Sequence, residues 1–539
     1  MAHRHNKPGL VRGAAVILLA ASVLAVTTYA QDAGTSFTPS RLKLQDALDS
    51  TLAQHPAAQI QRFQVKSAQG AKVQATGQFD TYFGSTVGQS TTNDPLTQND
   101  QLQAQQAGIN TSKIAGHLST YSFSETKQLR NGISFTSGVD VSRTTDNLLN
   151  LLGLNTSRIS VGLILPLLRG RGSSVVAARE RSATMEVTAS SLDLNQTISQ
   201  LLANTASSYW NLVAARKALS IAEASERRGQ TYVDNVQALI DADKSPRSDI
   251  HEVKANLADR SASRLQALQT VIAAQQQLAS DMGLRPSDLS DALEAIDDFP
   301  DASSFPTIAD DPGAIQEYVA QSLENRSDYL ASRERISEVT TQLTAARNQL
   351  RPQLDLSFTT GYLGLAEGRS GNQLLNSPFS GIQGMDSTVG LTYSFPAHNH
   401  AAEGQTMQAE AALSQAQLRS SEIVRNVNFT LKVAIEGVIN AKERVAQAGE
   451  SVKSFEAALS GEQEKYRLGS GSVVNILSVE DRLNSALANQ LQAQLTFALA
   501  LTQLRLASGS IAPRNEPIKS VDADLFRKTP FTQISRTGR

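Results

Sequence analysis

The sequence predicts a mainly α-helical chain that also contributes strands to a membrane β-barrel and is built from two duplicated half-units. Three observations support this fold class. Long proline-free segments carry apolar residues at the three- and four-residue spacing of helices. Six shorter segments have the length and alternation of tilted membrane strands. The two halves of the chain also repeat the same motifs in the same order.

Composition narrows the function classes. The chain has 539 residues, no cysteine, and a formal net charge of −2. The absence of cysteine excludes disulfide scaffolds, thiolate metal sites and cysteine nucleophiles. The neutral charge balance argues against a nucleic-acid partner, which usually meets a basic face. The chain is rich in alanine, glutamine, serine and leucine, and such a composition favours long helices.

The N-terminus has the pattern of an export signal. Basic residues precede an uncharged apolar run from Gly13 to Val26, which has about the length of a signal-peptide core. We predict a signal peptide over residues 1–30, cleaved after Ala30. The alternative is an uncleaved anchor, although the run is short for a spanning helix. An exported chain of this kind is periplasmic, secreted or part of an outer-membrane barrel.

The helices are predicted from the spacing of proline and apolar residues. Proline breaks helix interiors at a cost of about 3 kcal/mol, and no proline lies between Pro396 and Pro513. The segment from Ser190 to Glu226 carries an apolar stripe at helical spacing, although periodicity alone also fits an ordinary bundle. The predicted helices are Arg41–Gly77, Gly170–Ile240, Arg247–Gly283, Pro312–Leu350, Ala397–Leu468 and Ser472–Gly509. The two longest have about 70 residues, or roughly 105 Å of helix, which suits a tube.

Six strands are predicted, four in the first half and two in the second. Their ranges are Gln78–Ser90, Leu118–Thr126, Gly132–Arg143, Arg158–Leu168, Pro352–Leu363 and Ser387–Phe395. A tight turn at Lys127–Asn131 and longer polar loops elsewhere are typical of outer-membrane barrels. Six strands are too few to close a barrel, so several chains must contribute to one. The alternative is a small soluble sheet that caps a helical bundle.

The duplication sets the expected organisation. Ile198–Ile250 resembles Val424–Ile476, and each match leads into a helix that ends at glycine, Gly283 or Gly509. We predict a first structural repeat over residues 31–310 and a second over 311–510. The first repeat carries an extra insert that includes a strand hairpin, which either inserts in the barrel or lies outside the membrane. Residues 511–539 form a polar tail that is poorly ordered or lies along the exterior of the helical tube.

These motifs resemble the TolC family of outer-membrane efflux proteins. The resemblance is carried by LKLQDALDSTLAQHP from Leu42, EKYRLGSGSVVNIL from Glu464, and the strand–proline–helix junctions at Pro166 and Pro396. It covers about Leu42 to Gly509. It implies a homotrimer in which a β-barrel in the outer membrane continues as an α-helical tunnel across the periplasm.

The resemblance also implies a function. The chain would be the passive exit duct of a tripartite efflux pump or a type I secretion system in the outer membrane of a Gram-negative-type bacterium. Its partners would be a periplasmic adaptor and an inner-membrane transporter of the RND or ABC type, since no phosphate-binding loop occurs here. The alternative is a periplasmic adaptor of the same machinery. The duplication argues against it.

Candidate functional residues lie at the two turns between long helices, which we expect to meet at the periplasmic tip. By resemblance, the gate and selectivity candidates are Asp249, Asp241, Asp243, Asn475 and Ser478. Asp249 matches a constricting aspartate of the family, whereas Asn475 and Ser478 depart from that pattern. The candidates for the turn and adaptor contact are Tyr466, Leu468, Gly469, Gly471 and Ser472. A ring of charges sets ion selectivity in pores, but an aspartate at a helix N-terminus is also favoured by the dipole.

No catalytic constellation is present in the sequence, so neither an enzyme activity nor a cofactor is expected. His398 and His400 could share a metal ion, but we favour a solvated pair beside the strand end. Gly469 and Gly471 are expected at a helix C-terminus rather than around a phosphate.

Overall fold

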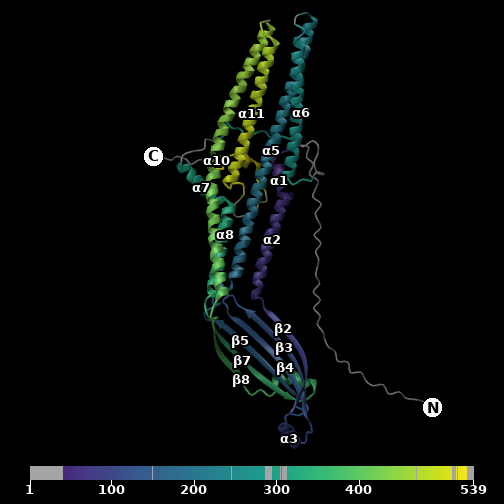
Figure 1. Ribbon diagram of the computed structural model, residues 1–539, viewed down its shortest axis with the longest axis vertical. Coiled ribbons are helices and arrows are strands. Elements are labelled where there is room, and N and C mark those ends of the chain that lie inside the picture. The colour runs from purple at the N-terminus through teal and green to yellow at the C-terminus, as the bar shows by residue number, and fades with distance from the viewer. Residues whose placement is uncertain are drawn as a thin grey trace, which may run out of the picture. The chain divides into compact units, whose positions relative to one another are not determined.

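The computed structural model describes residues 41–148, 150–243, 246–285, 294–303, 305, 312–468, 470–512, 518 and 520–530. The predicted signal peptide, residues 1–30, therefore lies outside the described residues. Segments of helix alternate with segments of strand along the chain, and in space the helices form one part of the molecule and the strands another (Figure 1). None of the helices in the described part of the chain is both long enough and apolar enough to cross a membrane.

The first half contains one long helix flanked by shorter ones. Its helices are α1 (Leu44–Gln54), α2 (Pro56–Thr76), α4 (Ser173–Val176), α5 (Ala178–Asp241) and α6 (Asp249–Asp281). The single helix predicted over Arg41–Gly77 is wrong, because the structure divides it at His55. Proline disfavours helical backbone in the residue before it, and His55 is extended, with a ψ of 125°. Pro56 then begins α2, where its missing N–H costs nothing.

The second half repeats this arrangement. Its helices are α7 (Pro312–Asn325), α8 (Ser327–Gln349), α10 (His400–Arg467) and α11 (Val473–Ala507). The prediction of one helix over Pro312–Leu350 is also wrong, because Arg326 is extended with a ψ of 116°. The Arg326 guanidinium pairs with Asp328 at 2.6 Å and donates to the Ala507 carbonyl, which holds the break against the end of α11.

Glycines at equivalent places join the helices of each half. Gly283 follows α6 with a φ of +74°, and a Cβ there would lie 2.7 Å from the Cα of His55. Gly509 follows α11 with a φ of +66°, and a Cβ there would lie 2.9 Å from the Cα of Arg326. Only glycine fits such a left-handed, close approach. As a result α6 and α2 follow one another along α5, and α11 and α8 follow one another along α10 (Figure 1).

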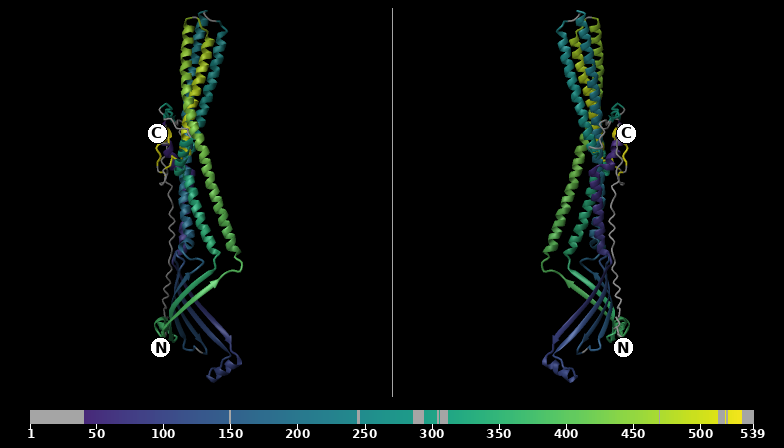
Figure 2. Two further views of the ribbon diagram at one scale, coloured as in Figure 1. Left: turned by 90° about the vertical axis from the view of Figure 1, so that its left-hand side faces the viewer. Right: turned by 90° about the vertical axis from the view of Figure 1, so that its right-hand side faces the viewer.

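The strands form one antiparallel sheet. Its members in the described ranges are β2 (Tyr82–Pro95), β3 (Lys113–Gln128), β4 (Ser134–Asp146), β5 (Leu154–Pro166), β7 (Gln353–Glu367) and β8 (Met385–Ser394). They pair in the order β2-β3-β4-β5-β7-β8, so the two halves meet between β5 and β7. Each predicted strand overlaps one of these. The sheet lies at one end of the helices, opposite the α5–α6 and α10–α11 turns (Figure 2).

Two loops at the end of the sheet away from the long helices contain short helices. Helix α3 (Gln98–Gln106) lies between β2 and β3, and α9 (Gly371–Asn376) lies between β7 and β8. The loop after α9 folds back on the sheet, where the N–H of Leu365 donates to the Ser380 carbonyl at 2.8 Å. A Cβ on Gly364 would lie 2.0 Å from the Ser377 carbonyl, so this close approach requires glycine.

A small core near the middle of the helices fixes both ends of the described chain. Strand β1 (Arg41–Leu42) pairs in parallel with β6 (Glu294–Ala295), and the fully buried Tyr209 and Trp210 of α5 pack beside them. Burying a large apolar side chain contributes about 1.5–3 kcal/mol. The rings of Trp210 and Phe299 lie 5.9 Å apart, and the Tyr209 hydroxyl donates to the Asp297 carboxylate at 2.7 Å.

The described part of the C-terminal tail packs on this core. Phe526, in the short helix η4 (Ala523–Arg527), is fully buried. The buried Arg505 of α11 donates to the carbonyls of Lys528 and Thr529 at 3.0 and 2.9 Å. Burial lowers the pKa of Arg505 to about 10, so it stays charged at neutral pH. The described residues of the tail therefore lie against the helices.

Candidate gate at the paired helix turns

The first turn joins α5 to α6. Asp241 ends α5 and accepts a hydrogen bond from Gln237 at 2.9 Å. Asp243 has a φ of +54° and is the one non-glycine residue of the described chain in the left-handed region, which aspartate tolerates better than most residues. Both side chains are exposed. Asp249 begins α6, where its carboxylate accepts from the Ser248 hydroxyl at 3.2 Å and lies near the positive end of the helix dipole.

The second turn joins α10 to α11. Ser472 caps α11, because its hydroxyl accepts from the N–H of Asn475 at 3.3 Å. A Cβ on Gly471 would lie 2.9 Å from the Tyr466 nitrogen, so this position requires glycine. Leu468 is 69% exposed, although it is large and apolar. Gly469 lies outside the described residues.

The two turns lie side by side, as the sequence predicts. Val236 and Val253 of the first hairpin share a buried cluster with Val473 and Leu477 of the second, and Tyr466 packs against it. Burial raises the pKa of Tyr466, and the negative charge of Asp249 raises it further. The structure therefore brings Asp249 and Tyr466, candidates from different halves, into one electrostatic environment.

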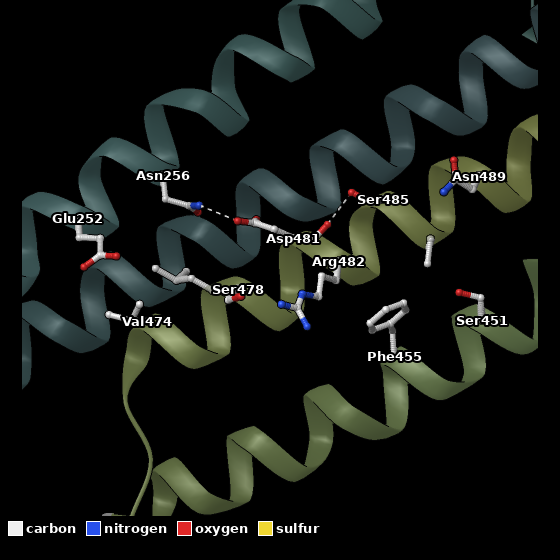
Figure 3. A pocket seen from close by; sticks show the side chains of 12 residues that line it. Glu252, Asn256, Ser451, Phe455, Val474, Ser478, Asp481, Arg482, Ser485 and Asn489 are labelled. Carbon is white, nitrogen blue, oxygen red and sulfur yellow. Dashed lines mark hydrogen bonds between the residues drawn. The ribbon is translucent and has the colours of Figure 1, made fainter.

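An open groove of about 600 Å³ lies next to this cluster, between α6, α10 and α11 (Figure 3). Ser478 lines it together with Glu252, Asn256 and Asp481. Asn475 and Ser478 are exposed, so the second hairpin presents neutral polar groups where the first presents carboxylates. Any acidic ring built from these candidates therefore rests on Asp249, Asp241 and Asp243.

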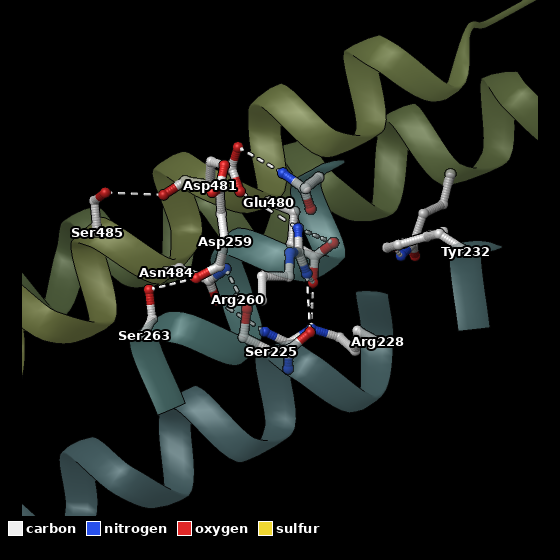
Figure 4. A network of polar contacts seen from close by, with 12 residues as sticks. Ser225, Arg228, Tyr232, Asp259, Arg260, Ser263, Glu480, Asp481, Asn484 and Ser485 are labelled. Atoms are coloured by element: carbon white, nitrogen blue, oxygen red, sulfur yellow. Dashed lines mark hydrogen bonds and ion pairs between the residues drawn. The ribbon is translucent and has the colours of Figure 1, made fainter. Parts of the chain in front are cut away.

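A buried ionic network ties the two hairpins together beyond the turns (Figure 4). Glu480 of α11 is fully buried and Arg260 of α6 is 6% exposed, with 3.0 Å between the Arg260 Nη1 and the Glu480 Oε1. Arg228 of α5 donates to the same carboxylate. Arg260 also donates to the Ser225 carbonyl at 3.0 Å and to Asp481 at 3.3 Å.

Amide hydrogen bonds extend the network. Asn484 accepts from Arg228 at 2.8 Å and donates to the Ser225 hydroxyl at 2.9 Å. Nearby, burial raises the pKa of Tyr232, and the negative charge of Glu480 adds to this rise. One carboxylate thus holds two guanidinium groups from the other half of the chain. A buried charge of this kind is costly unless it is paired, so the network favours one arrangement of the two hairpins.

The sequence analysis missed this network. A signal was available, because Glu480 lies three residues after Leu477 and three before Leu483, on the apolar stripe of its helix. A charge in such a stripe predicts a buried partner. What the sequence could not supply was the partner, since Arg260 lies 220 positions away.

The strand–helix junctions lie at the opposite end of the helices. Pro166 ends β5 opposite Asp355, and the N–H of Leu167 then donates to the Leu354 carbonyl at 2.7 Å. The N–H of Gly170 donates to the Asn348 side chain at 2.8 Å, which ties the segment between β5 and α4 to the end of α8. The long helix predicted from Gly170 begins at Ala178 instead. Pro396 follows β8 and is exposed.

Two histidines follow the second junction. The rings of His398 and His400 are stacked with 5.5 Å between their centres, and His400 lies 3.4 Å from Glu403. Within the described ranges, they do not belong to a group of three or more residues of the kinds that hold a metal ion.

Comparison with known proteins agrees with this geometry. Residues 138–284 match the model of the family described as outer membrane efflux protein. No curated protein matches the chain. Among solved structures, the fold is similar to the VceC outer membrane protein of Vibrio cholerae, with 18% identity, a TM-score of 0.57, and coverage of 86% of this chain and 96% of that one.

Two further channels have the same fold. The CmeC outer membrane channel of Campylobacter jejuni has 13% identity and a TM-score of 0.59, with 88% and 87% of the two chains covered. The MtrE outer membrane channel of Neisseria gonorrhoeae, in its open state, has 16% identity and a TM-score of 0.58, with 86% and 88% covered. The segment that matches the outer membrane efflux protein family and the fold shared with these channels confirm the resemblance found in the sequence.

Proposed function

We propose that the chain is the outer-membrane exit duct of a tripartite efflux pump or a type I secretion system, and that it works as a homotrimer. The observation that carries the proposal is the junction of two unlike parts. A sheet with exposed apolar side chains, such as Val389 and Leu391, runs directly into helices of 64 and 68 residues. The sheet suits lipid and the helices suit water, so the chain reaches from the outer membrane into the periplasm.

The gate is assigned to the paired turns of the two hairpins. Asp249 sits at the start of α6 and is partly exposed, with Asp241 and Asp243 close along the chain. A threefold repeat of these carboxylates would line a constriction and favour cations. Asn475 and Ser478 supply neutral polar groups from the second hairpin.

The same turns offer a surface for the periplasmic adaptor. Leu468 exposes most of its apolar side chain beside Tyr466, Gly471 and Ser472, and an exposed leucine at a turn suits a partner's apolar side chain. Gly469 belongs to the same proposed contact. Energy would come from an inner-membrane transporter of the RND or ABC type, since transport through an open duct needs no chemistry in the duct itself.

The alternative of a periplasmic adaptor loses its basis. Neither the family match nor the similar folds support an adaptor, and all of the named structures are outer-membrane channels or proteins.

The duct itself is tested by imaging. Outer membranes of an expressing Gram-negative host are solubilised, and the purified chain is examined by negative-stain microscopy and light scattering. A threefold particle with the mass of three chains, longer than about 100 Å as 64-residue helices require, supports the proposal. A monomer absent from the outer-membrane fraction contradicts it.

The adaptor surface is tested by substitution. Leu468→Ser should abolish co-purification with the adaptor and leave the trimer intact. The matched control is Leu102→Ser in α3, an equally apolar residue that is 58% exposed in a loop beyond the sheet. Equal loss of the adaptor in both variants, or in neither, contradicts the assignment of the turn as the contact.

A further inference from the structure

The two halves of the chain contribute unequal numbers of strands to the sheet. The first half contributes β2, β3, β4 and β5, and the second contributes only β7 and β8. The extra strands form the β3–β4 hairpin. We infer that all six described strands cross the lipid and that β8 of one chain pairs with β2 of the next, so that three copies close a barrel of 18 strands. This inference rests on the proposed function and its threefold assembly.

One face of the sheet is apolar across its width. Hydrogen-bond register places one residue of each strand from β3 to β8 in a single cross-strand row. The residues of this row are Phe123, Val139, Ile159, Tyr362 and Met385. Phe83 of β2 extends the face, since its ring stacks on that of Phe123 with 6.0 Å between centres. The side chains of β3 and β4 therefore belong to the same apolar surface as those of β5, β7 and β8.

The opposite face is polar across the same width. The neighbouring residues on the six strands form a second row, Gly84, Ser124, Gly138, Ser160, Gly361 and Asp386. Charges on this face pair across strands, since Arg158 is in register with Asp140 and lies 3.8 Å from Asp386. Apolar outside and polar inside is the pattern of a membrane barrel with a wet lumen. In these two rows β3, β4, β5, β7 and β8 follow it, and β2 adds Phe83 beside Ser85, its own residue in the apolar row.

The hairpin is held in place at the end next to the helices. The Arg130 guanidinium, in the turn between β3 and β4, makes two hydrogen bonds to Glu180 of α5, at 2.8 and 2.7 Å. It also lies over the Phe79 ring, 4.7 Å from its centre. The N–H of Gly172 donates to the Asn131 carbonyl at 3.0 Å. The turn is therefore part of the junction between sheet and helices.

A β3–β4 hairpin outside the lipid would disrupt strand pairing in the rest of the sheet as well. Strand β3 is paired with β2 along its length and β4 with β5, so removal of the hairpin would separate β2 from the sheet. It would create two further unpaired edges in the bilayer, where unpaired backbone groups are not tolerated. With the hairpin inserted, the open edges are β2 and β8, and a second copy of the chain satisfies both.

Lipid exposure is tested with single cysteines, because the chain has none of its own. On β3, Phe123→Cys lies on the apolar face and Ser124→Cys on the polar face. On β7, Phe358→Cys and Thr359→Cys are the matched reference pair. Each variant is reconstituted as the trimer in phospholipid vesicles and treated with a charged, water-soluble maleimide. A cysteine in apolar surroundings reacts slowly because the thiolate is the nucleophile.

The inserted hairpin predicts that Phe123→Cys and Phe358→Cys both react at least about tenfold more slowly than their polar-face neighbours. Fast reaction of Phe123→Cys with protection of Phe358→Cys would overturn the inference and leave the duct proposal standing. Fast reaction of all four would overturn both. If a substitution prevents assembly, cryo-electron microscopy of the unchanged trimer decides the matter. A barrel of 18 strands supports the inference, and a smaller one with the hairpin outside the lipid contradicts it.

Discussion

Arg260 of α6 and Glu480 of α11 form a buried ion pair, with 3.0 Å between Nη1 and Oε1, that joins the two halves of the duplicated chain. Glu480 also accepts from Arg228 of α5, so one carboxylate holds three helices together. Glu480 lies three residues after Leu477 in α11, and Leu477 belongs to the buried cluster against which Tyr466 packs. Any motion that separates α11 from α5 and α6 must break the ion pair, which couples the network to the proposed gate.

Glu480→Gln should loosen the packing of the two hairpins at the proposed gate. The variant removes the counter-charge that the buried Arg260 shares with the partly exposed Arg228, and it leaves Arg260 only the exposed Asp481. Breaking a buried pair costs about 3–5 kcal/mol. We expect higher single-channel conductance in planar bilayers and faster hydrogen exchange in α11 near residue 480. Unchanged conductance and exchange would mean that the network has no part in holding the hairpins closed.

A double replacement provides the control. Substituting Arg260→Met together with Glu480→Leu removes both charges, and apolar replacement of a buried pair is often neutral or stabilising. The double variant should therefore be closer to the unchanged protein than Glu480→Gln alone in thermal stability. Asp481→Asn, at a side chain that is 55% exposed, should have little effect on either measurement.

Asp249→Asn should reduce the cation preference of the channel. The variant removes one charge from each chain at the start of α6 and keeps the size of the side chain. Reversal potentials in a salt gradient measure the preference, and Asp241→Asn and Asp243→Asn show how much each neighbour adds. If selectivity is unchanged in all three variants, the turn does not form a selective ring.

Arg130→Ala should impair assembly of the barrel, because Arg130 joins the β3–β4 turn to Glu180 at the base of α5. We expect a lower yield of folded trimer in the outer membrane, measured by its resistance to dissociation in mild detergent. Exchanging the charges, with Arg130→Glu and Glu180→Arg together, should restore part of that yield. Failure of the exchange together with a normal yield for Arg130→Ala would show that the contact is dispensable.

Asp297 should make the protein sensitive to acid. Although burial alone would raise its pKa, hydrogen bonds from Leu44 and Tyr209 and the charge of Arg527 lower the pKa below its ordinary value of 3.8. A depressed pKa contributes stability above the ordinary value, and this contribution is lost as pH falls through the lower folded value. Thermal unfolding between pH 7 and pH 3 should show this loss. In Asp297→Asn the melting temperature should be lower at pH 7 and should change less across the same range.

The pKa of Glu338 is shifted in the opposite direction to that of Asp297. Burial raises the pKa of this α8 side chain, and the charge of Glu186 raises it further. A raised carboxyl pKa contributes stability at low pH that is lost as pH rises through the folded value. Glu338→Gln should therefore raise the melting temperature at pH 8 and leave it unchanged at pH 4. Glu317→Gln, at an exposed position of α7, should change neither value.

The sequence was sufficient to predict the kinds of elements and their order. Proline-free amphipathic segments predicted α5 and α10 to within a few residues at their C-terminal ends, Asp241 and Arg467. The alternation in Phe123-Ser124 and its counterparts predicted strands, because side chains on a strand point to opposite faces in turn. The repeat of these patterns predicted two similar halves. Each of these properties depends on residues that are close together in the chain, so it can be predicted from the sequence alone.

The two helix breaks that the sequence analysis missed depend on contacts with distant parts of the chain. The breaks at His55 and Arg326 each lie against a glycine at the end of another helix, Gly283 or Gly509, more than 180 positions along the chain. Pro56 marked the first break in the sequence, but nothing comparable marked the second. Periodicity continues across both breaks, so it predicted continuous helices.

For the candidate site, too, the sequence predicted some features and the tertiary structure supplied others. The sequence by itself determined the two helix turns, because turns and caps depend on neighbouring residues, and the resemblance to the family singled out Asp249, Tyr466 and Gly471 in them. Only the tertiary structure placed Arg260 on Glu480 and joined β5 to β7. It also placed Arg130 on Glu180, which ties the extra hairpin to the helices. The pairing of residues far apart in the chain depends on how whole helices and strands pack, and that information is spread over every residue of the two contacting faces.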